Sequence, residues 1–190
     1  PAWQPQPRPL LIQALWLVGC SLRPVALLLG MQSMDSAMTY TTTTSKPEQT
    51  LELGYQVGQR CRGGETIELV SDLGGGKTVF VQGLAKGLGY NGDVASPTFV
   101  ISRDYQLPGN LSLHHFDLYR IMDGDMAALE LAEFIADPQS ITAVEWGSNV
   151  SGVLPDSRIR VTIVARSEED REVKITTSPE YDYVLQGLNS

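Results

Sequence analysis

The sequence has few cysteines and few basic residues, and each shortage excludes a class of protein. Its two cysteines, Cys20 and Cys61, are too few for a disulfide framework or a cysteine-based metal site, which favours a reducing compartment such as the cytoplasm. There are 14 Lys and Arg residues against 22 Asp and Glu, a formal net charge of -8. Because binding to a phosphate backbone depends on clustered basic residues, so acidic a chain is not expected to hold nucleic acid by itself.

Residues 1–44 also lack a long apolar run, and they are expected to be a leader outside the folded domain. Their apolar stretches fall short of the roughly 18–20 residues that cross a bilayer, so no membrane attachment by a spanning helix is expected. The residues ending at Cys20 resemble a lipoprotein signal. We favour the alternative that this part is upstream sequence and that translation begins at Met31, Met34 or Met38. Residues 39–45 would then be a loose amino terminus.

Hydrophobic periodicity and turn residues predict one domain over residues 45–177 and a tail over residues 178–190. Helices are expected between residues 45 and 62, 77 and 88, and 125 and 134. Strands are expected over residues 66–70, 99–107, 111–118, 141–144, 158–165 and 172–177. Strands that alternate with helices early and form a hairpin late predict an α/β fold. Its central sheet would be mostly parallel and flanked by helices, with a C-terminal antiparallel hairpin.

The segment SDLGGGKT, residues 71–78, lies between a predicted strand and a predicted helix and is typical of a loop that binds polyphosphate. Small residues let several backbone N–H groups approach the anion, and the following helix adds its positive N-terminal end. Lys77 would reach the β- and γ-phosphates, and the Thr78 hydroxyl would bind Mg²⁺. The other residues expected to contact the nucleotide phosphates are Leu73, Gly74, Gly75 and Gly76.

A phosphate loop does not by itself distinguish a kinase from an ATPase or a switch, so two further segments matter. Pro97 stiffens the backbone before Thr98, whose hydroxyl could sense the γ-phosphate or its Mg²⁺. Glu145 ends a short apolar strand, just before Trp146. An acid at that place beside a phosphate loop binds Mg²⁺ through water. The pair Thr98 and Glu145 is therefore expected to face the phosphates.

The strand before residue 118 carries polar residues within an apolar run. Aspartate is disfavoured inside strands, so Asp117 at the strand end suggests a role in orienting water or holding the Mg²⁺ hydration shell. The neighbouring His114 and His115 point to opposite faces of the strand, which is not the spacing of a metal site. We interpret both histidines as structural.

Taken together, these segments resemble the TsaE (YjeE) family in unbroken order from residue 45 to residue 176. The resemblance lies in an opening helix, a phosphate loop, an S-P-T-[FY] switch, an H-x-D-x-Y-R strand and an [IV]-E-W element. These are residues 45–54, 71–78, 96–99, 115–120 and 144–146 of this sequence. The set in this order is specific, although each motif alone is modest.

The resemblance implies a P-loop fold that binds ATP with Mg²⁺, and a weak ATPase that acts with the TsaD and TsaB proteins. In that system a threonylcarbamoyl group is placed on adenosine 37 of tRNAs that read codons beginning with A, so tRNA would be met only through the complex. The roles carried over by position are phosphate binding by Lys77, Mg²⁺ binding by Thr78 and Glu145, hydrolysis by Asp117, switching by Thr98 and packing by Trp146.

The phosphate loop departs from the family's usual G-D-L-G-A-G-K-T-T at three positions. Here Ser71, Gly75 and Val79 stand in place of Gly, Ala and Thr. Gly75 adds backbone freedom to the loop, which must be lost on binding. We therefore expect weaker nucleotide binding than is typical of the family, and a gain in binding from Gly75→Ala.

Two other functions stay open at this point. A P-loop small-molecule or nucleoside kinase would normally need an arginine-rich lid, and only Arg103 and Arg120 occur between Thr98 and Trp146. Such a kinase would form ADP in response to an acceptor without a protein partner. A non-catalytic binding module with a degenerate loop is supported by Ser71 alone, and it would bind ATP weakly or not at all.

Overall fold

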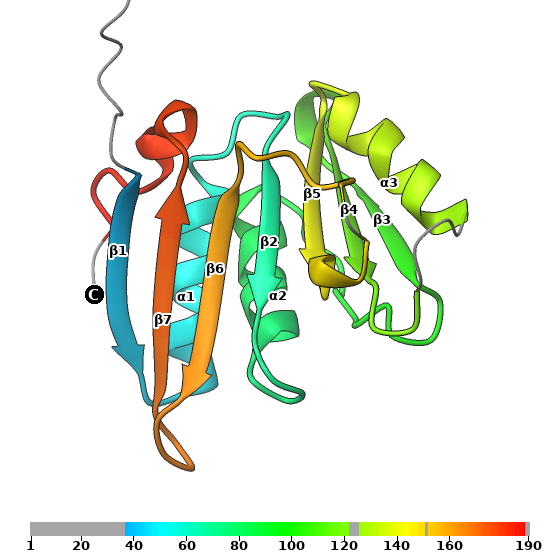
Figure 1. Cartoon of the computed structure of the whole chain (residues 1–190). Helices are drawn as coiled ribbons and strands as arrows, with labels where there is room; N and C mark the ends of the chain where they lie inside the picture. The colour runs from blue at the N-terminus through cyan, green and yellow to red at the C-terminus, as the bar shows by residue number, and fades with distance from the viewer. Residues whose placement is uncertain (1–36, 122–125, 151, 189–190) are drawn as a thin grey trace, which may run out of the picture. The chain divides into compact units, whose positions relative to one another are not determined.

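The computed structural model describes residues 37–121, 126–150 and 152–188. Residues 1–36 of the expected leader 1–44, with the lipoprotein-like signal, lie outside them. Seven strands form one sheet in the order β1-β7-β6-β2-β5-β4-β3 (Figure 1). The strands are β1 (Met38–Thr44), β2 (Thr66–Val70), β3 (Ser102–Gln106), β4 (Ser112–Asp117), β5 (Ser140–Glu145), β6 (Ile159–Ala165) and β7 (Arg171–Thr177). The helices are α1 (Pro47–Gly58), α2 (Lys77–Gly87) and α3 (Met126–Ala136). None of the helices in these residues is long and apolar enough to cross a membrane.

The sheet is mixed, so the prediction of a mostly parallel sheet is confirmed only for its central strands. β6, β2, β5 and β4 pair in parallel, whereas β1 with β7, β7 with β6, and β3 with β4 pair antiparallel. The predicted C-terminal hairpin is formed by β6 and β7. The connection from β3 to β4 contains only a 3₁₀ turn at Pro108–Asn110. So short a connection cannot make the crossover that a parallel pair requires.

Residues 38–44 form the edge strand β1, in place of the loose amino terminus that their polar composition suggested. The strand pairs without interruption from Met38 opposite Thr177 to Thr44 opposite Arg171. Threonine is β-branched and favours extended backbone, and one face of an edge strand accepts polar side chains. Thr44 is buried, and its hydroxyl lies 2.8 Å from the Thr50 hydroxyl of α1. The strand therefore joins the first helix to the sheet.

Alternate residues of the central strands contribute to two separate cores. Ile67 and Leu69 of β2 pack with Phe80 of α2 in the larger core, which also contains apolar residues of α1, β6 and β7. Phe116 of β4 and Val144 of β5 pack in the smaller core with residues of α3. Because successive side chains of a strand point to opposite faces, α1 and α2 cover one face and α3 covers part of the other. Figure 1 shows α1 and α2 behind β7, β6 and β2.

Helices α1 and α2 pack with their backbones in contact, through glycines spaced four residues apart. A Cβ at Gly83 would lie 1.9 Å from the carbonyl oxygen of Leu51, closer than real Cβ atoms come. The same holds for the other glycines of the contact, which together are Gly54, Gly58, Gly83 and Gly87. Small residues at this spacing let two helices approach closely. The contact holds α2, whose first turn follows the phosphate loop, against α1.

The segment after β7, which was predicted as a C-terminal tail, packs on the domain up to residue 188. Val184 is fully buried. The Tyr183 hydroxyl donates to Glu65 Oε1 at 2.5 Å, and this buried carboxylate also accepts the backbone N–H groups of Arg62 and Gly63. The pKa of Tyr183 is raised: burial contributes most, and the hydrogen bond to Glu65 comes second. These three donors supply the hydrogen bonds that a buried carboxylate needs, and one of them comes from the C-terminal segment. Leu188 also packs on the larger core, so residues up to 188 belong to the fold.

Candidate nucleotide-binding site

The predicted site residues meet at one edge of the sheet, where the parallel strands β2, β5 and β4 end. The phosphate loop follows β2, Glu145 ends β5, and Asp117 ends β4 directly opposite Glu145 in the register. All the residues expected from the sequence line one cavity of about 290 Å³: Leu73, Gly74, Gly75, Gly76, Lys77, Thr78, Thr98, Asp117, Glu145 and Trp146. Val79 and Ser96 also line it. Ligands of open α/β sheets bind at such carboxyl ends.

Two glycines of the phosphate loop are required by its backbone conformation. Gly74 has φ 73° and Gly76 has φ 108°, both in the left-handed region that favours glycine. Gly76 is also the N-cap of α2, so the helix begins where the loop ends. The first N–H groups of a helix have no partner within it, and they carry its positive end. The start of α2 therefore offers N–H donors and a favourable field to an anion.

Gly75 lies against the side chain of Ser71. A Cβ at position 75 would lie 1.8 Å from Ser71 Oγ and 3.1 Å from the Asp72 carbonyl oxygen. Ser71 Oγ donates to that same carbonyl at 2.9 Å. Serine at position 71 thus fills the space that an alanine side chain at position 75 would take. The two departures from the usual pattern are complementary to each other.

We now expect Gly75→Ala to weaken ATP binding by about tenfold, which reverses the gain that the sequence suggested. The added methyl group forces Ser71 Oγ off the Asp72 carbonyl, and overpacking of this kind costs about 1–3 kcal/mol. The double variant Ser71→Gly/Gly75→Ala should bind within about twofold of the parent, because the clash is gone. A fluorescence titration with a labelled ATP measures both. Equal affinity for the parent and Gly75→Ala would show that the loop tolerates the methyl group.

In the part of the chain that the structure describes, Lys77 is the only Lys or Arg that lines this cavity. It is buried, and its Nζ donates to the carbonyl oxygens of Ser71 at 3.2 Å and Asp72 at 3.1 Å. Nζ also lies 3.7 Å from Glu145 Oε2 and 4.9 Å from the centre of the Trp146 ring. A phosphate oxygen makes a stronger partner for an ammonium group than a neutral carbonyl does. The lysine is thus placed to exchange its carbonyl partners for phosphate.

Thr98 and Asp117 are linked by a short hydrogen bond. Thr98 Oγ1 donates to Asp117 Oδ2 at 2.5 Å, and Ser96 Oγ lies 2.6 Å from Thr98 Oγ1. The backbone N–H of Tyr119 donates to the other Asp117 oxygen at 3.1 Å. Ile101, where this segment enters β3, has φ 71°, a strained value for a β-branched residue. The predicted switch hydroxyl and the predicted hydrolysis carboxylate therefore form one connected unit.

Sequence reasoning gave His115 no part in the site, yet it contacts Glu145. Its Nε2 lies 3.0 Å from Glu145 Oε1, and the ring is fully buried. His114 points to the other face, where it stacks on Phe134 with ring centres 3.6 Å apart and bonds to Asp104 at 2.7 Å. The structural interpretation thus fits His114. A signal for His115 was available in the sequence, since residues two apart on a strand share a face and Asp117 was already a site residue.

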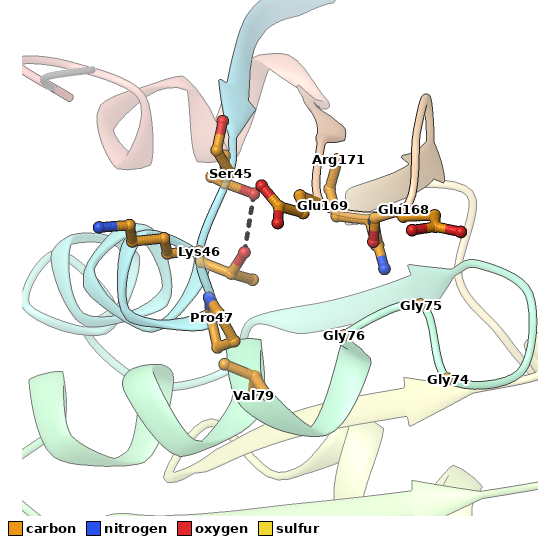
Figure 2. A pocket seen from close by; sticks show the side chains of 12 residues that line it. Ser45, Lys46, Pro47, Gly74, Gly75, Gly76, Val79, Glu168, Glu169 and Arg171 are labelled. Carbon is orange, nitrogen blue, oxygen red and sulfur yellow. Dashed lines mark hydrogen bonds between the residues drawn. The ribbon is translucent and has the colours of Figure 1, made fainter.

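A second cavity, of about 450 Å³, lies on the other side of the phosphate loop and was also missed (Figure 2). Gly74, Gly75 and Gly76 line it as they line the first. The remaining side chains come from the end of β1, the start of α1, α2, and the turn between β6 and β7 with the first residue of β7, and Figure 2 labels most of them. They are Thr44, Ser45, Lys46, Pro47, Thr50, Val79, Glu168, Glu169 and Arg171. A ligand held by its phosphates has room here for its remaining part.

The donor set fits a nucleotide with Mg²⁺. Backbone N–H groups at a helix start and Lys77 suit phosphate oxygens. The Thr78 hydroxyl and the carboxylates of Asp117 and Glu145 are oxygen ligands, which Mg²⁺ prefers, and Mg²⁺ usually keeps several waters and binds substrate phosphates as well. A phosphate loop at the carboxyl edge of parallel strands, followed by a helix, defines a P-loop nucleotide-binding protein.

Comparison with known proteins gives the family. The model described as "Threonylcarbamoyl adenosine biosynthesis protein TsaE" matches residues 44–173, and the chain belongs to this family. The TsaE family has a role in threonylcarbamoyladenosine modification of tRNA, and it is a nucleotide-binding ATPase family. The matched residues include both cavities' phosphate-loop glycines and all the predicted site residues.

Individual relatives agree with the family match. The chain is 35% identical to the tRNA threonylcarbamoyladenosine biosynthesis protein TsaE of Bacillus subtilis over 133 residues, which are 70% of this chain and 82% of the relative. It is 37% identical to the Nostoc protein of the same name over 132 residues, 68% of this chain and 80% of the relative. The crystal structure of YdiB from Bacillus subtilis superposes with a TM-score of 0.66 at 28% identity, covering 79% of this chain and 93% of that one.

Proposed function

We propose that this chain is a Mg²⁺-dependent ATPase that supports threonylcarbamoyladenosine formation at position 37 of tRNAs reading codons that begin with A. It would act in the cytoplasm with the TsaD and TsaB proteins, which would hold the tRNA. The observation that carries the proposal is that every residue carried over from the family by position lines one cavity beside the phosphate loop. The names of the relatives support the tRNA pathway.

The chain's residues would divide the work along the phosphate loop. The backbone of Gly74 to Gly76 would hold the phosphates, and Lys77 would leave its carbonyl partners to bind the β- and γ-phosphates. Thr78 and Glu145 would hold Mg²⁺, which supplies positive charge against the phosphate oxygens when it is bound. Asp117 would be needed for hydrolysis, and Trp146 would pack beside the site.

The switch would run through the hydrogen bond between Thr98 and Asp117. A γ-phosphate near this hydroxyl would compete for it and move residues 96–101. Phe99 in this segment is 86% exposed, and Val100 beside it is also exposed, which suits a surface that docks on a partner protein. We therefore expect the affinity for TsaB and TsaD to depend on the bound nucleotide. Equal affinity with ATP, with ADP and without nucleotide would reject the switch.

The experiment that tests the proposed function measures ATP hydrolysis with Mg²⁺, with and without TsaB and TsaD of the same cell. We expect slow turnover by the chain alone and faster turnover with the partners, because the partners would complete or order the switch segment. The control adds an unrelated acidic protein at the same concentration. If the rate of ATP hydrolysis did not change with the partners but rose with a small phosphate acceptor, the result would support the kinase alternative instead.

A further inference from the structure

His115 is fully buried, and only one of its two ring nitrogens has a hydrogen-bond partner among the described residues. Its Nε2 lies 3.0 Å from Glu145 Oε1, whereas its Nδ1 has no hydrogen-bond partner in the part of the chain that the structure describes. A buried polar atom without a partner is costly, so such an atom in a native protein needs a reason. The reason lies in what the other ring nitrogen does.

The contact with Glu145 decides which nitrogen carries the proton. An ionised carboxylate can only accept hydrogen bonds, so Nε2 must be the donor. When the ring is neutral, Nδ1 then carries only a lone pair. A charge-assisted bond at Nε2 is stronger than a neutral one, and it offsets the acceptor left without a partner at Nδ1. The neutral imidazole can therefore donate to Glu145 in only one of its two tautomers, the one with the proton on Nε2.

Glu145 depends on this bond for its position. Among the described residues, His115 is the only one that donates a hydrogen bond to its carboxylate, and the second oxygen, Oε2, lies 3.7 Å from Lys77 Nζ. Asp117, on the neighbouring strand, is held by two donors, the Thr98 hydroxyl and the Tyr119 N–H. Without the His115 bond, Glu145 would be free to close on Lys77, which would occupy a carboxylate and an ammonium group that the nucleotide site needs.

We propose that His115 is a positioning residue that holds the Glu145 carboxylate toward the metal position and away from Lys77. This inference rests on the proposed function, in which Glu145 serves Mg²⁺. Partners that orient a metal-binding carboxylate act through hydrogen bonds, and their loss typically lowers metal affinity by about 10–100-fold. His115 is not itself among the residues that line the cavity, so it would act through Glu145.

The test compares three replacements of His115 that differ in where they can place an N–H. His115→Gln puts an amide near the original Nε2, His115→Asn puts one near Nδ1, and His115→Leu has none. We expect the Mg²⁺-dependent gain in ATP affinity to fall about tenfold in the Asn and Leu variants and to stay within about threefold of the parent in the Gln variant. Binding of ATP in EDTA should also weaken in the Asn and Leu variants, because Glu145 would then occupy Lys77, and it should stay near that of the parent in the Gln variant. His114→Gln is the matched control and should behave as the parent does.

Equal losses in the Gln, Asn and Leu variants would show that His115 only fills space, and would overturn the proposal. Because a core variant can fail to fold, ¹⁵N spectra of the parent give a second test, made simple by the chain's two histidines. We expect the Nε2–H tautomer for His115 and a shift of its Nε2 resonance in Glu145→Gln. An Nδ1–H tautomer would overturn the proposal. If the parent had the Nε2–H tautomer but bound ATP equally well with and without Mg²⁺, the result would instead count against the proposed function.

Discussion

Lys77→Ala is expected to lower ATP turnover by at least about a hundredfold and to weaken ATP binding as well. Among the described residues, Lys77 is the only Lys or Arg that lines the cavity of about 290 Å³ at the phosphate loop, where Asp117 and Glu145 add negative charge. Removing the lysine leaves the carboxylates to repel a triphosphate. A preorganised group that stabilises charge at the reacting atoms is typically worth about 10²–10³ in rate. Single-turnover hydrolysis with Mg²⁺, together with an ATP titration, measures both effects.

The matched control is Lys86→Ala, which removes an exposed lysine in the last turn of the same helix. This variant should keep turnover and affinity within about twofold of the parent, because a screened surface charge contributes little. Thermal unfolding of both variants separates loss of chemistry from loss of fold. Turnover that survives in Lys77→Ala would mean that the measured hydrolysis does not come from this cavity.

Gly83→Ala is expected to lower the free energy of unfolding by about 3 kcal/mol or more, a severe loss for one methyl group. Elsewhere in a helix the same change stabilises by about 1 kcal/mol, because alanine loses less backbone entropy than glycine. Here the new Cβ would lie 1.9 Å from the Leu51 carbonyl oxygen and 2.9 Å from the Tyr55 backbone nitrogen. These are backbone atoms of α1, so no side-chain rotation relieves the clash and the helices must separate.

Urea unfolding measures this loss, and Lys86→Ala again supplies a control with the same new residue on the same helix. The control should change the free energy of unfolding by less than about 0.5 kcal/mol. Because α2 begins at the phosphate loop, a folded Gly83→Ala variant should also bind ATP more weakly. A variant as stable as the parent would show that the two helices do not approach as closely as described.

Local sequence signals predicted the helices and strands well where a strong hydrophobic pattern was bounded by clear turn residues. β2 occupies the predicted residues 66–70, and α2 begins at the predicted Lys77. Glycines mark the turn before α2, and apolar residues at helical spacing mark its buried face. The site residues could be predicted from the same logic, because a phosphate loop and acidic strand ends converge at one edge of any such sheet.

What was missed depends on partners that are distant in the sequence. Nothing in the polar run of β1 shows that β7, more than 100 residues later, is available to pair with it. His115 reads as an ordinary strand residue until β5 brings Glu145 beside it. The glycines of α1 and α2 look like weak helix formers until the two backbones meet. Similarly, Gly75 looks like added freedom until Ser71 Oγ occupies the space beside it.

The sequence by itself determined the α/β class, the phosphate loop, the acidic strand ends and the family they resemble. Each of these is a property of a short segment, since backbone conformation and hydrophobic period are set by neighbours along the chain. Only the tertiary structure decided the mixed strand order, the second cavity, the bond between His115 and Glu145 and the close contact of α1 with α2. These are properties of pairs of segments, and such pairs depend on packing and hydrogen bonds that form only when folding brings distant segments together.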